Sequence, residues 1–349
     1  MNHAIIGCGR VAPNHATAVA DSGVGRVVWA CDRDPVALEA FAARYSIPRL
    51  SLDHSTVLND PAVDSVSIAV DHAQHAPLAR AALQAGKHVL VEKPTALSVA
   101  EGRELIELAA RRRLLFATVA QHRFDPLFQE VKRLVTGGKL GPLVSLWATL
   151  VCGREPGYYR DSYWRGTWAG EGGSLFVNQA YHCIDLLIAL GGQPAVISCK
   201  TEILKLGDVL ETEDAAVATL VFPNGALGLL ACVSATTEFW RSRFDIIGAE
   251  GSITFDIDHP AKLHHCVLPK GVDTSALETA AALIEPRPPG LEYYGVSHNR
   301  QLADFLGAVR EARPHALAPE AGLDTLKVIS ELYAAARRSV DCLSRSGLT

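Results

Sequence analysis

The first 120 residues alternate between short apolar runs and segments in which apolar residues recur with a helical period. The apolar runs show little polar alternation and are predicted strands, at residues 3–7, 27–31, 63–70, 88–92 and 114–120. The segments between them are predicted helices, at residues 12–22, 35–45, 76–86 and 98–113. Helices that separate strands of this kind are typical of a parallel sheet covered on both faces.

The pattern changes after residue 123. A predicted helix at residues 127–135 leads into an alternating strand at residues 141–153. At least four strand-like runs follow within residues 195–255, and Asn224-Gly225 marks a hairpin turn between two of them. Consecutive strands without intervening helices predict a mostly antiparallel sheet.

The chain is therefore predicted to be an α/β protein with two domains. Residues 1–120 form a doubly wound parallel-sheet domain, and residues 121–349 form an α/β domain with a large open, mostly antiparallel sheet. Residues 267–292 are rich in Pro and Gly and are predicted loops. The final helices, at residues 296–312 and 319–340, are expected to pack back on the N-terminal domain.

Composition narrows the possible functions. The 349 residues carry a formal net charge of -5, so the basic face of a nucleic-acid-binding protein is not expected. The eight cysteines contain no CxxC pair, which argues against a zinc site and is typical of free thiols in a reducing compartment. The first strand begins beside the initiator Met, and no apolar run is long enough to span a membrane. We expect a cytoplasmic protein with no signal peptide, membrane contact or metal.

The turn after the first strand has the spacing Gly7-x-Gly9-x-x-Ala12. Gly7 permits a tight turn, Gly9 lets the backbone approach a pyrophosphate, and Ala12 keeps the helix close to the sheet. The N-terminus of the following helix then faces the phosphates. The simpler interpretation is a strand-to-helix turn that is merely rich in glycine. The strand before the motif and the helix after it favour a dinucleotide site.

Asp32 ends the second strand, about 20 residues after the glycine motif, where an acid accepts hydrogen bonds from ribose hydroxyls. An ordinary polar residue at a strand end is the alternative interpretation. The Asp32 carboxylate would repel a 2′-phosphate and therefore favours NAD. The neighbouring Arg33 can stack on adenine or bind that phosphate, so NADP stays an alternative.

A second motif, Glu92-Lys93-Pro94, stands at the end of the strand at residues 88–92. Ligands of open parallel sheets bind at the carboxyl ends of the strands, so Lys93 can reach a substrate hydroxyl there. Pro94 restrains the backbone and tolerates a cis peptide bond. Taken alone, a lysine before a proline is usually a solvated loop residue.

Several motifs together resemble the Gfo/Idh/MocA oxidoreductase family. They are GCGR, DHAQHAP, AGKHVLVEKP, AQHRF and GG…NQAYHCID, in the family's order and over essentially the whole chain. The resemblance implies a Rossmann domain followed by an α/β domain whose open sheet often packs against another subunit. It also implies hydride transfer between a nicotinamide ring and a sugar or polyol carbon, with Lys93 at the reacting hydroxyl. Where the family often has Pro-Asn, this chain has Asp71-His72.

The same resemblance locates the cofactor contacts. They are expected in the glycine turn, after the second and third strands and in the Glu-Lys-Pro motif. The residues are Gly7, Gly9, Arg10, Val11, Asp32, Arg33, Val70, His75, Glu92 and Lys93.

A polar stripe interrupts the otherwise apolar segment 172–188. At roughly 100° per residue, Asn178, His182 and Asp185 share one side of a predicted helix. The stripe can face water or hold a core histidine, although it lacks the Lys and Glu of a solvated face. In the functional interpretation His182 takes a proton from an alcohol, Lys93 stabilises the alkoxide or relays the proton, and Asn178 binds a neighbouring hydroxyl. The resemblance is to an Asp-x-x-x-His pair in which Asn178 replaces the Asp, and Asp185 is assigned a structural role.

The segment 155–173 gathers aromatic side chains around an arginine. Tyr163, Trp164 and Arg165 suit a sugar face and an anionic group, or alternatively an interface plug. The run Trp-Arg-Gly-Thr-Trp, followed by Gly-Gly and Asn-Gln-x-x-His, resembles the nucleotide-sugar branch of the family, which acts at sugar C3. Arg123 is expected to support the site or to contact substrate.

The sequence thus predicts an NAD(P)-dependent oxidoreductase acting on a secondary alcohol of a sugar or nucleotide sugar, at ring carbon 3. Lys93 and His182 are the catalytic candidates, and the substrate-side candidates are Asn178, Arg165, Tyr163, Trp164 and Arg123. The alternatives are an inositol or aldose dehydrogenase, a glycosidase that uses bound NAD for transient oxidation, and a non-catalytic sugar or cofactor sensor. A homodimer or homotetramer through the C-terminal sheet is expected.

Overall fold

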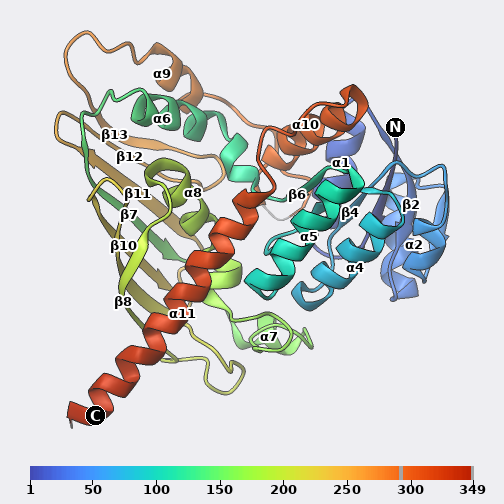
Figure 1. The fold of residues 1–349 in the computed structure, drawn as a ribbon, viewed down its shortest axis with the longest axis horizontal. Helices are drawn as coiled ribbons and strands as arrows, with labels where there is room; N and C mark the ends of the chain where they lie inside the picture. The colour runs from blue at the N-terminus through green and yellow to red at the C-terminus, as the bar shows by residue number, and fades with distance from the viewer. Residues whose placement is uncertain (291–293, 347–349) are drawn as a thin grey trace. The chain divides into compact units, whose positions relative to one another are not determined.

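The computed structural model describes residues 1–290 and 294–346, with side chains up to residue 338. The chain forms two compact units, each with its own sheet (Figure 1). The first unit contains Met1–Gln121 and Glu285–Leu323, and the second contains His122–Ile284 and Asp324–Thr349.

The first unit is built on a six-stranded parallel sheet in the order β3-β2-β1-β4-β5-β6. Its strands are β1 (Asn2–Ile6), β2 (Arg26–Cys31), β3 (Arg49–Ser51), β4 (Ser65–Ile68), β5 (His88–Val91) and β6 (Phe116–Thr118). The central strands are buried on both faces, which explains their lack of polar alternation. The strand order reverses between β1 and β4, the place where ligands of open parallel sheets bind. The predicted parallel sheet is confirmed.

Helices lie on both faces of this sheet (Figure 1). They are α1 (Ala12–Asp21), α2 (Pro35–Tyr45), α3 (His54–Leu58), α4 (His72–Gln84), α5 (Val99–Arg112) and α10 (Ser297–Glu311). β3 and α3 escaped prediction because both are short and largely polar. α4 begins at His72 rather than at residue 76, because Pro77 lies inside the helix instead of in its first turn.

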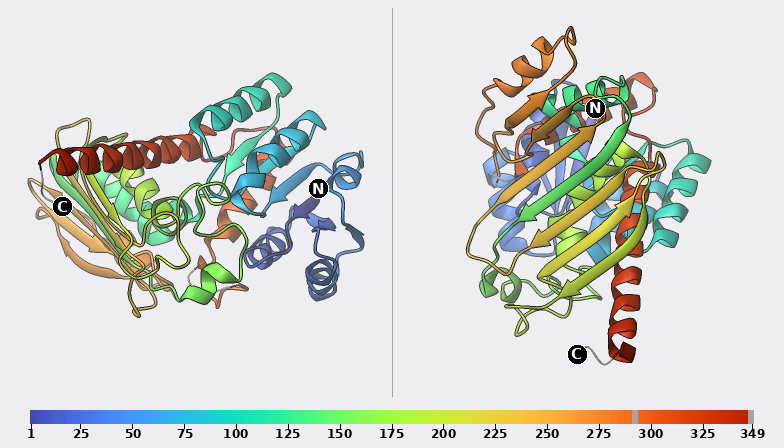
Figure 2. Two further views of the ribbon diagram at one scale, coloured as in Figure 1. Left: turned by 90° about the horizontal axis from the view of Figure 1, so that it is seen from below. Right: turned by 90° about the vertical axis from the view of Figure 1, so that its left-hand side faces the viewer.

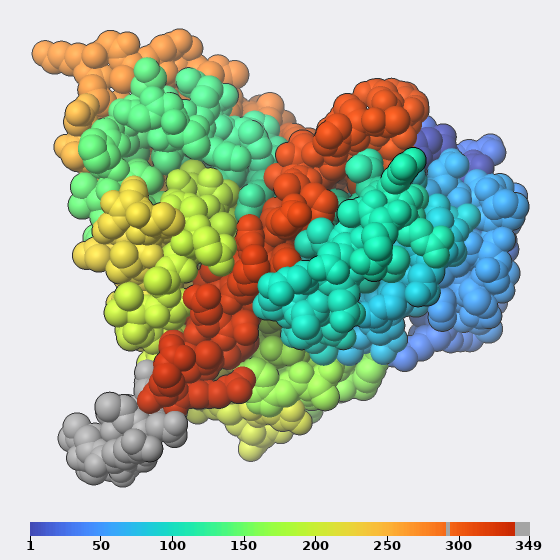
Figure 3. All heavy atoms as spheres, viewed as in Figure 1, coloured from blue at the N-terminus to red at the C-terminus, as the bar shows by residue number. Residues whose placement is uncertain are grey.

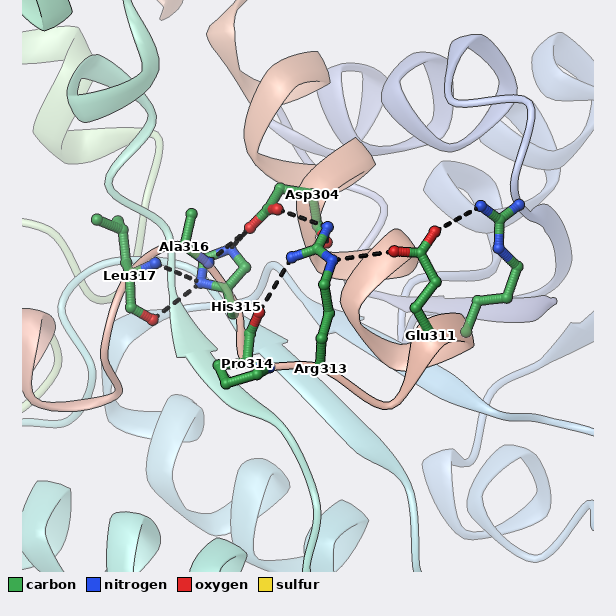
Figure 4. Close-up of polar contacts among 8 residues, drawn as sticks. Asp304, Glu311, Arg313, Pro314, His315, Ala316 and Leu317 are labelled. Carbon is green, nitrogen blue, oxygen red and sulfur yellow. Dashed lines mark hydrogen bonds and ion pairs between the residues drawn. The ribbon is translucent and has the colours of Figure 1, made fainter.

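α10 brings a late part of the chain back to the first unit. Its apolar face packs against α1, through Leu302, Phe305 and Leu306 against Ala18 and Val19. Asp304, within α10, binds two residues that follow the helix. Its carboxylate accepts a hydrogen bond from the Ala316 N–H at 2.7 Å and pairs with Arg313 at 2.8 Å (Figure 4). These contacts anchor the segment that follows α10 to the helix itself.

The second unit is built on a seven-stranded sheet in the order β13-β12-β11-β7-β10-β9-β8. Its strands are β7 (Leu143–Val151), β8 (Ala195–Glu202), β9 (Ala215–Val221), β10 (Leu227–Val233), β11 (Arg241–Gly248), β12 (Ser252–Phe255) and β13 (Leu263–Val267). β7 and β10 pair in parallel, and the other neighbouring pairs are antiparallel. Asn224-Gly225 forms the predicted β9–β10 hairpin, with Gly225 at φ +85°. The mostly antiparallel sheet is confirmed.

The helical segments of this unit and its borders are η1 (Gln121–Phe124), α6 (Pro126–Thr136), α7 (Pro156–Arg160), η2 (Leu175–Gln179), α8 (Tyr181–Gly191), α9 (Ser275–Ala281) and α11 (Glu320–Ser346). Buried side chains of α6, α8 and α11 share one apolar core with the inner face of the sheet. One side of α11 stays on the surface (Figure 3). No helix in the described ranges combines the length and hydropathy needed to cross a bilayer.

No helix lies across the other face of this sheet in the view that looks onto it (Figure 2, right). Large apolar side chains stay exposed there: Trp147 is 40 %, Val217 46 % and Leu227 61 % exposed. The register puts these residues on the same face of three neighbouring strands, with Trp147 opposite Leu229 and Val217 opposite Ala231. The second unit therefore has one packed and one open sheet face.

The segment predicted as one helix with a polar stripe is instead two helical pieces. η2 is a turn of π-helix in which the Ala180 N–H donates to the Leu175 carbonyl at 2.7 Å, and α8 begins only at Tyr181. The buried Glu213 carboxylate accepts from the Phe176 N–H at 3.1 Å and so holds the start of the turn. Asn178 and His182 consequently lie on different helical pieces, and the 100° spacing does not relate their side chains.

Candidate functional site

The glycine turn of the first unit has the geometry that its spacing predicts. Gly7 has φ +97°, and a Cβ atom there would lie 2.3 Å from the Ala69 carbonyl oxygen. Around Gly9 no described atom lies within 4 Å of where a Cβ would stand. The backbone is therefore uncovered directly before α1, which suits a pyrophosphate at the helix N-terminus.

Asp32 lies at the end of β2, beside this turn. Its Oδ2 accepts from the Cys8 N–H at 2.7 Å and its Oδ1 from the Asp34 N–H at 2.9 Å. Each carboxylate oxygen can accept a further bond, so the side chain is oriented and still able to bind ribose hydroxyls. The Arg33 side chain is 69 % exposed, and its Nη2 lies 3.8 Å from the Asp71 carboxylate.

The remaining expected cofactor residues of this unit surround the same sheet edge. Arg10 is exposed in the turn, and Val11 occupies the N-cap position of α1. Val70 follows β4, and its Cγ1 would lie 3.0 Å from a Cβ on Gly7. His75 is buried, with Nδ1 2.7 Å from the Pro94 carbonyl and Nε2 3.3 Å from the Val70 carbonyl. His75 thus joins the Val70 turn to the Glu-Lys-Pro motif.

The Glu92-Lys93-Pro94 motif follows β5, and its Lys93–Pro94 peptide bond is cis. Lys93 is half-buried, whereas Glu92 is buried. Burial disfavours the charged form of Glu92, but hydrogen bonds from His15 and His298 outweigh it and hold its pKa well below the usual value. Glu92 is therefore an ionised carboxylate next to Lys93.

In the second unit, His182 lies in the first turn of α8. Its ring packs edge-on against the His122 ring with the centroids 4.8 Å apart. The His122 Nδ1 in turn lies 2.6 Å from the Asp125 carboxylate. His182 is half-buried, which leaves it in reach of a ligand.

Asp185, one turn further along α8, is 1 % exposed and bound to Arg123. The Arg123 Nε and Nη2 donate to the two carboxylate oxygens at 2.8 and 2.7 Å. The Thr325 hydroxyl also donates to Asp185, at 3.0 Å. This geometry favours the structural role for Asp185, and it points to support rather than substrate contact for Arg123.

Asn178 is paired with a carboxylate that sequence reasoning missed. Its Nδ2 donates to Glu171, a fully buried residue whose other oxygen accepts from the Gly166 N–H at 2.6 Å. The Tyr158 hydroxyl lies 3.4 Å from the same Nδ2. Because its nitrogen faces Glu171, the amide presents its oxygen in the other direction, as a hydrogen-bond acceptor. The only sequence signal for Glu171 was a single acid between glycines.

Two arginines flank the Tyr158 ring. The Arg165 guanidinium lies 4.4 Å from its centroid and the Arg154 guanidinium 4.9 Å from it. Arg154 is buried and donates to the Gln179 side chain at 2.7 Å. Among the described residues, Arg165 forms no ion pair; it donates to the Tyr158 carbonyl at 3.3 Å and lies 5.1 Å from the Trp164 ring. The structure thus gathers two guanidinium groups around the Tyr158 ring, and Arg154 was not singled out from the sequence.

The other aromatic residues of the loop divide into two groups. Tyr163 is 68 % exposed, and Trp164 is half-buried. Trp168 instead donates to the Glu211 carbonyl and packs edge-on against Tyr333, and Tyr159 is buried. Trp168 and Tyr159 therefore pack within the second unit, whereas Tyr163, Trp164 and Arg165 keep exposed or half-buried side chains.

Two family models match this chain. Residues 1–120 match the oxidoreductase family with the NAD-binding Rossmann fold, and residues 128–254 match the GFO/IDH/MocA C-terminal domain. The chain belongs to the Gfo/Idh/MocA family. Its first unit is the NAD-binding Rossmann domain, and the glycine turn and Asp32 fit that cofactor. The predicted family, enzyme class and NAD cofactor are confirmed.

Proteins similar to this chain in sequence or structure are consistent with this family assignment. An uncharacterised oxidoreductase of Bacillus subtilis, YrbE, is 25 % identical, covering 87 % of this chain and 85 % of its own. A scyllo-inositol 2-dehydrogenase (NAD(+)) of the same organism is 28 % identical over 72 % of each chain. The crystal structure of the WlbA dehydrogenase of Bordetella pertussis, in complex with NADH and UDP-GlcNAcA, superimposes with a TM-score of 0.85 at 25 % identity, over 97 % of this chain and 96 % of that one.

Proposed function

We propose that this member of the family is an NAD-dependent dehydrogenase for a sugar that carries an anionic group, such as a nucleotide-linked uronate, and that it acts at ring carbon 3. The observation that carries the proposal is Arg165, a half-buried cation with no ion pair among the described residues, within a loop that also presents Tyr163 and Trp164. A guanidinium pairs with carboxylate or phosphate, and aromatic rings stack on the C–H face of a sugar. The similarity to WlbA supports the same substrate class.

The reaction needs two transfers. NAD⁺ held by the glycine turn and Asp32 would accept a hydride from the carbinol carbon, and the hydroxyl proton would pass to a base, so that alcohol and NAD⁺ would give ketone, NADH and a proton. We assign the proton to His182 and Lys93. Asn178, oriented by Glu171, accepts a hydrogen bond from a neighbouring sugar hydroxyl. Bound NAD supplies the hydride acceptor.

The substrate class is tested by initial rates of NAD reduction on a UDP-linked N-acetylglucosaminuronate, the matching neutral UDP sugar, free glucose and myo-inositol. We expect the acidic nucleotide sugar to be the best substrate. Arg165→Leu should raise its KM about 10–100-fold, because a charge-assisted pair is lost, and should leave the KM of the neutral sugar nearly unchanged. Arg160→Leu, at the exposed C-terminal residue of α7, is the control and should change neither.

Other outcomes of this screen would replace the proposal. Preference for myo-inositol would indicate the inositol branch, which the scyllo-inositol 2-dehydrogenase relative represents. Release of free sugar without net NADH would indicate a glycosidase. Equal KM effects of Arg165→Leu on acidic and neutral sugars would contradict the anionic-group assignment.

We also propose that the open sheet face of the second unit binds a second copy of this chain. Its centre is apolar, with Trp147, Val217 and Leu227 exposed on three neighbouring strands. Charged residues stand on the flanking strands β11 and β8, including Arg241, Arg243 and Lys200. An apolar centre with a polar rim is typical of an interface between subunits.

This assembly is tested by light scattering of the eluting protein. The wild type should have a mass of two or four chains of 37.4 kDa. Trp147→Glu places a charge at the centre of the face and should give single chains. The control, Val36→Glu, changes an equally apolar residue of α2 that is 74 % exposed and should leave the mass unchanged. A monomeric wild type would exclude this interface.

A further inference from the structure

A chain of buried hydrogen bonds runs through the interior of the first unit to the Glu-Lys-Pro motif. The His3 Nδ1 lies 2.8 Å from the Ser65 Oγ, and its Nε2 lies 2.9 Å from the Ser67 Oγ. The His15 Nδ1 lies 2.9 Å from the same Ser67 oxygen, and its Nε2 lies 2.8 Å from the Glu92 Oε1. All five residues are buried, and the mechanism proposed above assigns a role to none of them.

The protonation states of the groups in this hydrogen-bond network follow from their surroundings. Burial, with His15 nearby, lowers the pKa of His3 to about 3, so His3 is neutral and has one donor and one acceptor nitrogen. Glu92 is ionised and only accepts, so the His15 Nε2 must donate to it. The His298 Nε2 lies 3.4 Å from the same Glu92 oxygen, within ion-pair distance. Both histidine rings therefore contact the same carboxylate oxygen, Oε1 of Glu92.

His15, Glu92 and His298 also have the residue types of a metal site. One ligand atom each of His15, Glu92 and His298 lies within 4.8 Å of the others. Nitrogen and oxygen ligands at about 2.0–2.1 Å from a tetrahedral zinc would be about 3.3 Å apart. The 2.8 Å between His15 Nε2 and Glu92 Oε1 is shorter than that and fits a shared proton. The spacing favours a hydrogen-bond network over a metal centre.

The second carboxylate oxygen of Glu92, Oε2, contacts the backbone of Lys93. The Glu92 Oε2 accepts from the Lys93 backbone N–H at 3.3 Å. His75, whose Nδ1 lies 2.7 Å from the Pro94 carbonyl, restrains the motif from α4. The carboxylate is thus bound on one side by two histidines and on the other by the backbone of the proposed catalytic lysine.

We propose that His15 and His298, supported by Ser67 and His3, are positioning residues: they keep Glu92 ionised and oriented, and Glu92 in turn sets the position and charge environment of Lys93. This inference rests on the proposed function of Lys93. The titratable groups that face Glu92 are His15 from α1, His298 from α10, His75 from α4 and Lys93 itself.

The test is the pH dependence of kcat in His298→Phe. Removing the His298 ring takes away one of the two contacts that lower the pKa of Glu92, so its carboxylate becomes protonated at a higher pH and Lys93 loses its charged neighbour there. The acidic limb of the kcat profile should therefore move to higher pH, by about one unit. NADH affinity, measured by fluorescence at pH 8, should be unchanged. In His298→Gln an amide N–H replaces the ring donor, and the limb should return towards the wild-type position.

A purely structural role would lower the melting temperature in both variants and leave the pH profile in place, and that result would overturn the inference. If His298→Phe does not fold, Ser67→Ala carries the test, because it breaks the link from His3 to His15 and should shift the limb in the same direction. A stoichiometric metal ion that co-purifies with the wild type and is absent from His298→Gln would also overturn it.

A second readout does not require a substrate. In the ¹⁵N NMR spectrum of the wild type, the His15 Nε2 should carry a proton, and His3 should stay neutral from pH 5 to 9, as its pKa of about 3 requires. If the wild type oxidises no sugar, the proposed function fails whatever these spectra show. If it oxidises sugars but His298→Phe keeps the wild-type limb, the positioning inference alone fails.

Discussion

Replacing Lys93 by alanine is expected to lower kcat about 10³-fold and to leave NADH affinity nearly unchanged. Proton transfer by a positioned side chain contributes about 10²–10⁴-fold to a rate, whereas the proposed cofactor contacts are mainly the glycine turn and Asp32. Steady-state rates on the best substrate of the screen give kcat, and NADH fluorescence titration gives the affinity.

Lys93→Arg distinguishes two possible roles of the Lys93 side chain, relay of a proton and stabilisation of the alkoxide by positive charge. Arginine keeps the positive charge but does not release a proton at accessible pH, so a proton relay predicts a variant nearly as slow as Lys93→Ala. Recovery of most of the rate in Lys93→Arg would show that Lys93 acts through charge alone. A kcat near that of the wild type in Lys93→Ala would remove Lys93 from the mechanism.

Replacing Asp185 by alanine is expected to destabilise the second unit by about 3–5 kcal/mol. The substitution leaves the Arg123 guanidinium in the interior without the carboxylate that now binds it at 2.8 and 2.7 Å. Urea unfolding followed by tryptophan fluorescence measures the loss. NADH affinity should not change, because the cofactor contacts lie in the other unit.

The matched control removes both charges. In Arg123→Met/Asp185→Leu no unpaired charge stays buried, and apolar replacement of a buried ion pair is often neutral or stabilising. The double variant should therefore recover most of the loss. A loss below about 1 kcal/mol in Asp185→Ala would contradict the structural role that the geometry gives to this pair. Normal KM values in the folded double variant would show that Arg123 does not contact substrate.

Much of the fold was readable from local patterns. The parallel sheet follows from apolar strands that alternate with helices, and the β9–β10 hairpin follows from Asn224-Gly225, because each depends on residues close together in the chain. The short β3 and α3 carry too few apolar residues to produce a period. The π-turn of η2 was missed because it depends on Glu213, which meets Phe176 across 37 residues of sequence.

In the candidate site, too, some features follow from local sequence and others depend on tertiary contacts. The sequence by itself determined the cofactor turn, Asp32 and the Glu92-Lys93-Pro94 motif, since each depends on backbone conformation within a few residues. Only the tertiary structure decided that Arg123 binds Asp185, 62 residues away. It also decided that Glu92 is held by His15, 77 residues away, within a buried chain of hydrogen bonds. The physical reason is that a hydrogen-bonded partner is set by where the folded chain brings two side chains together, and no periodicity along the sequence records that meeting.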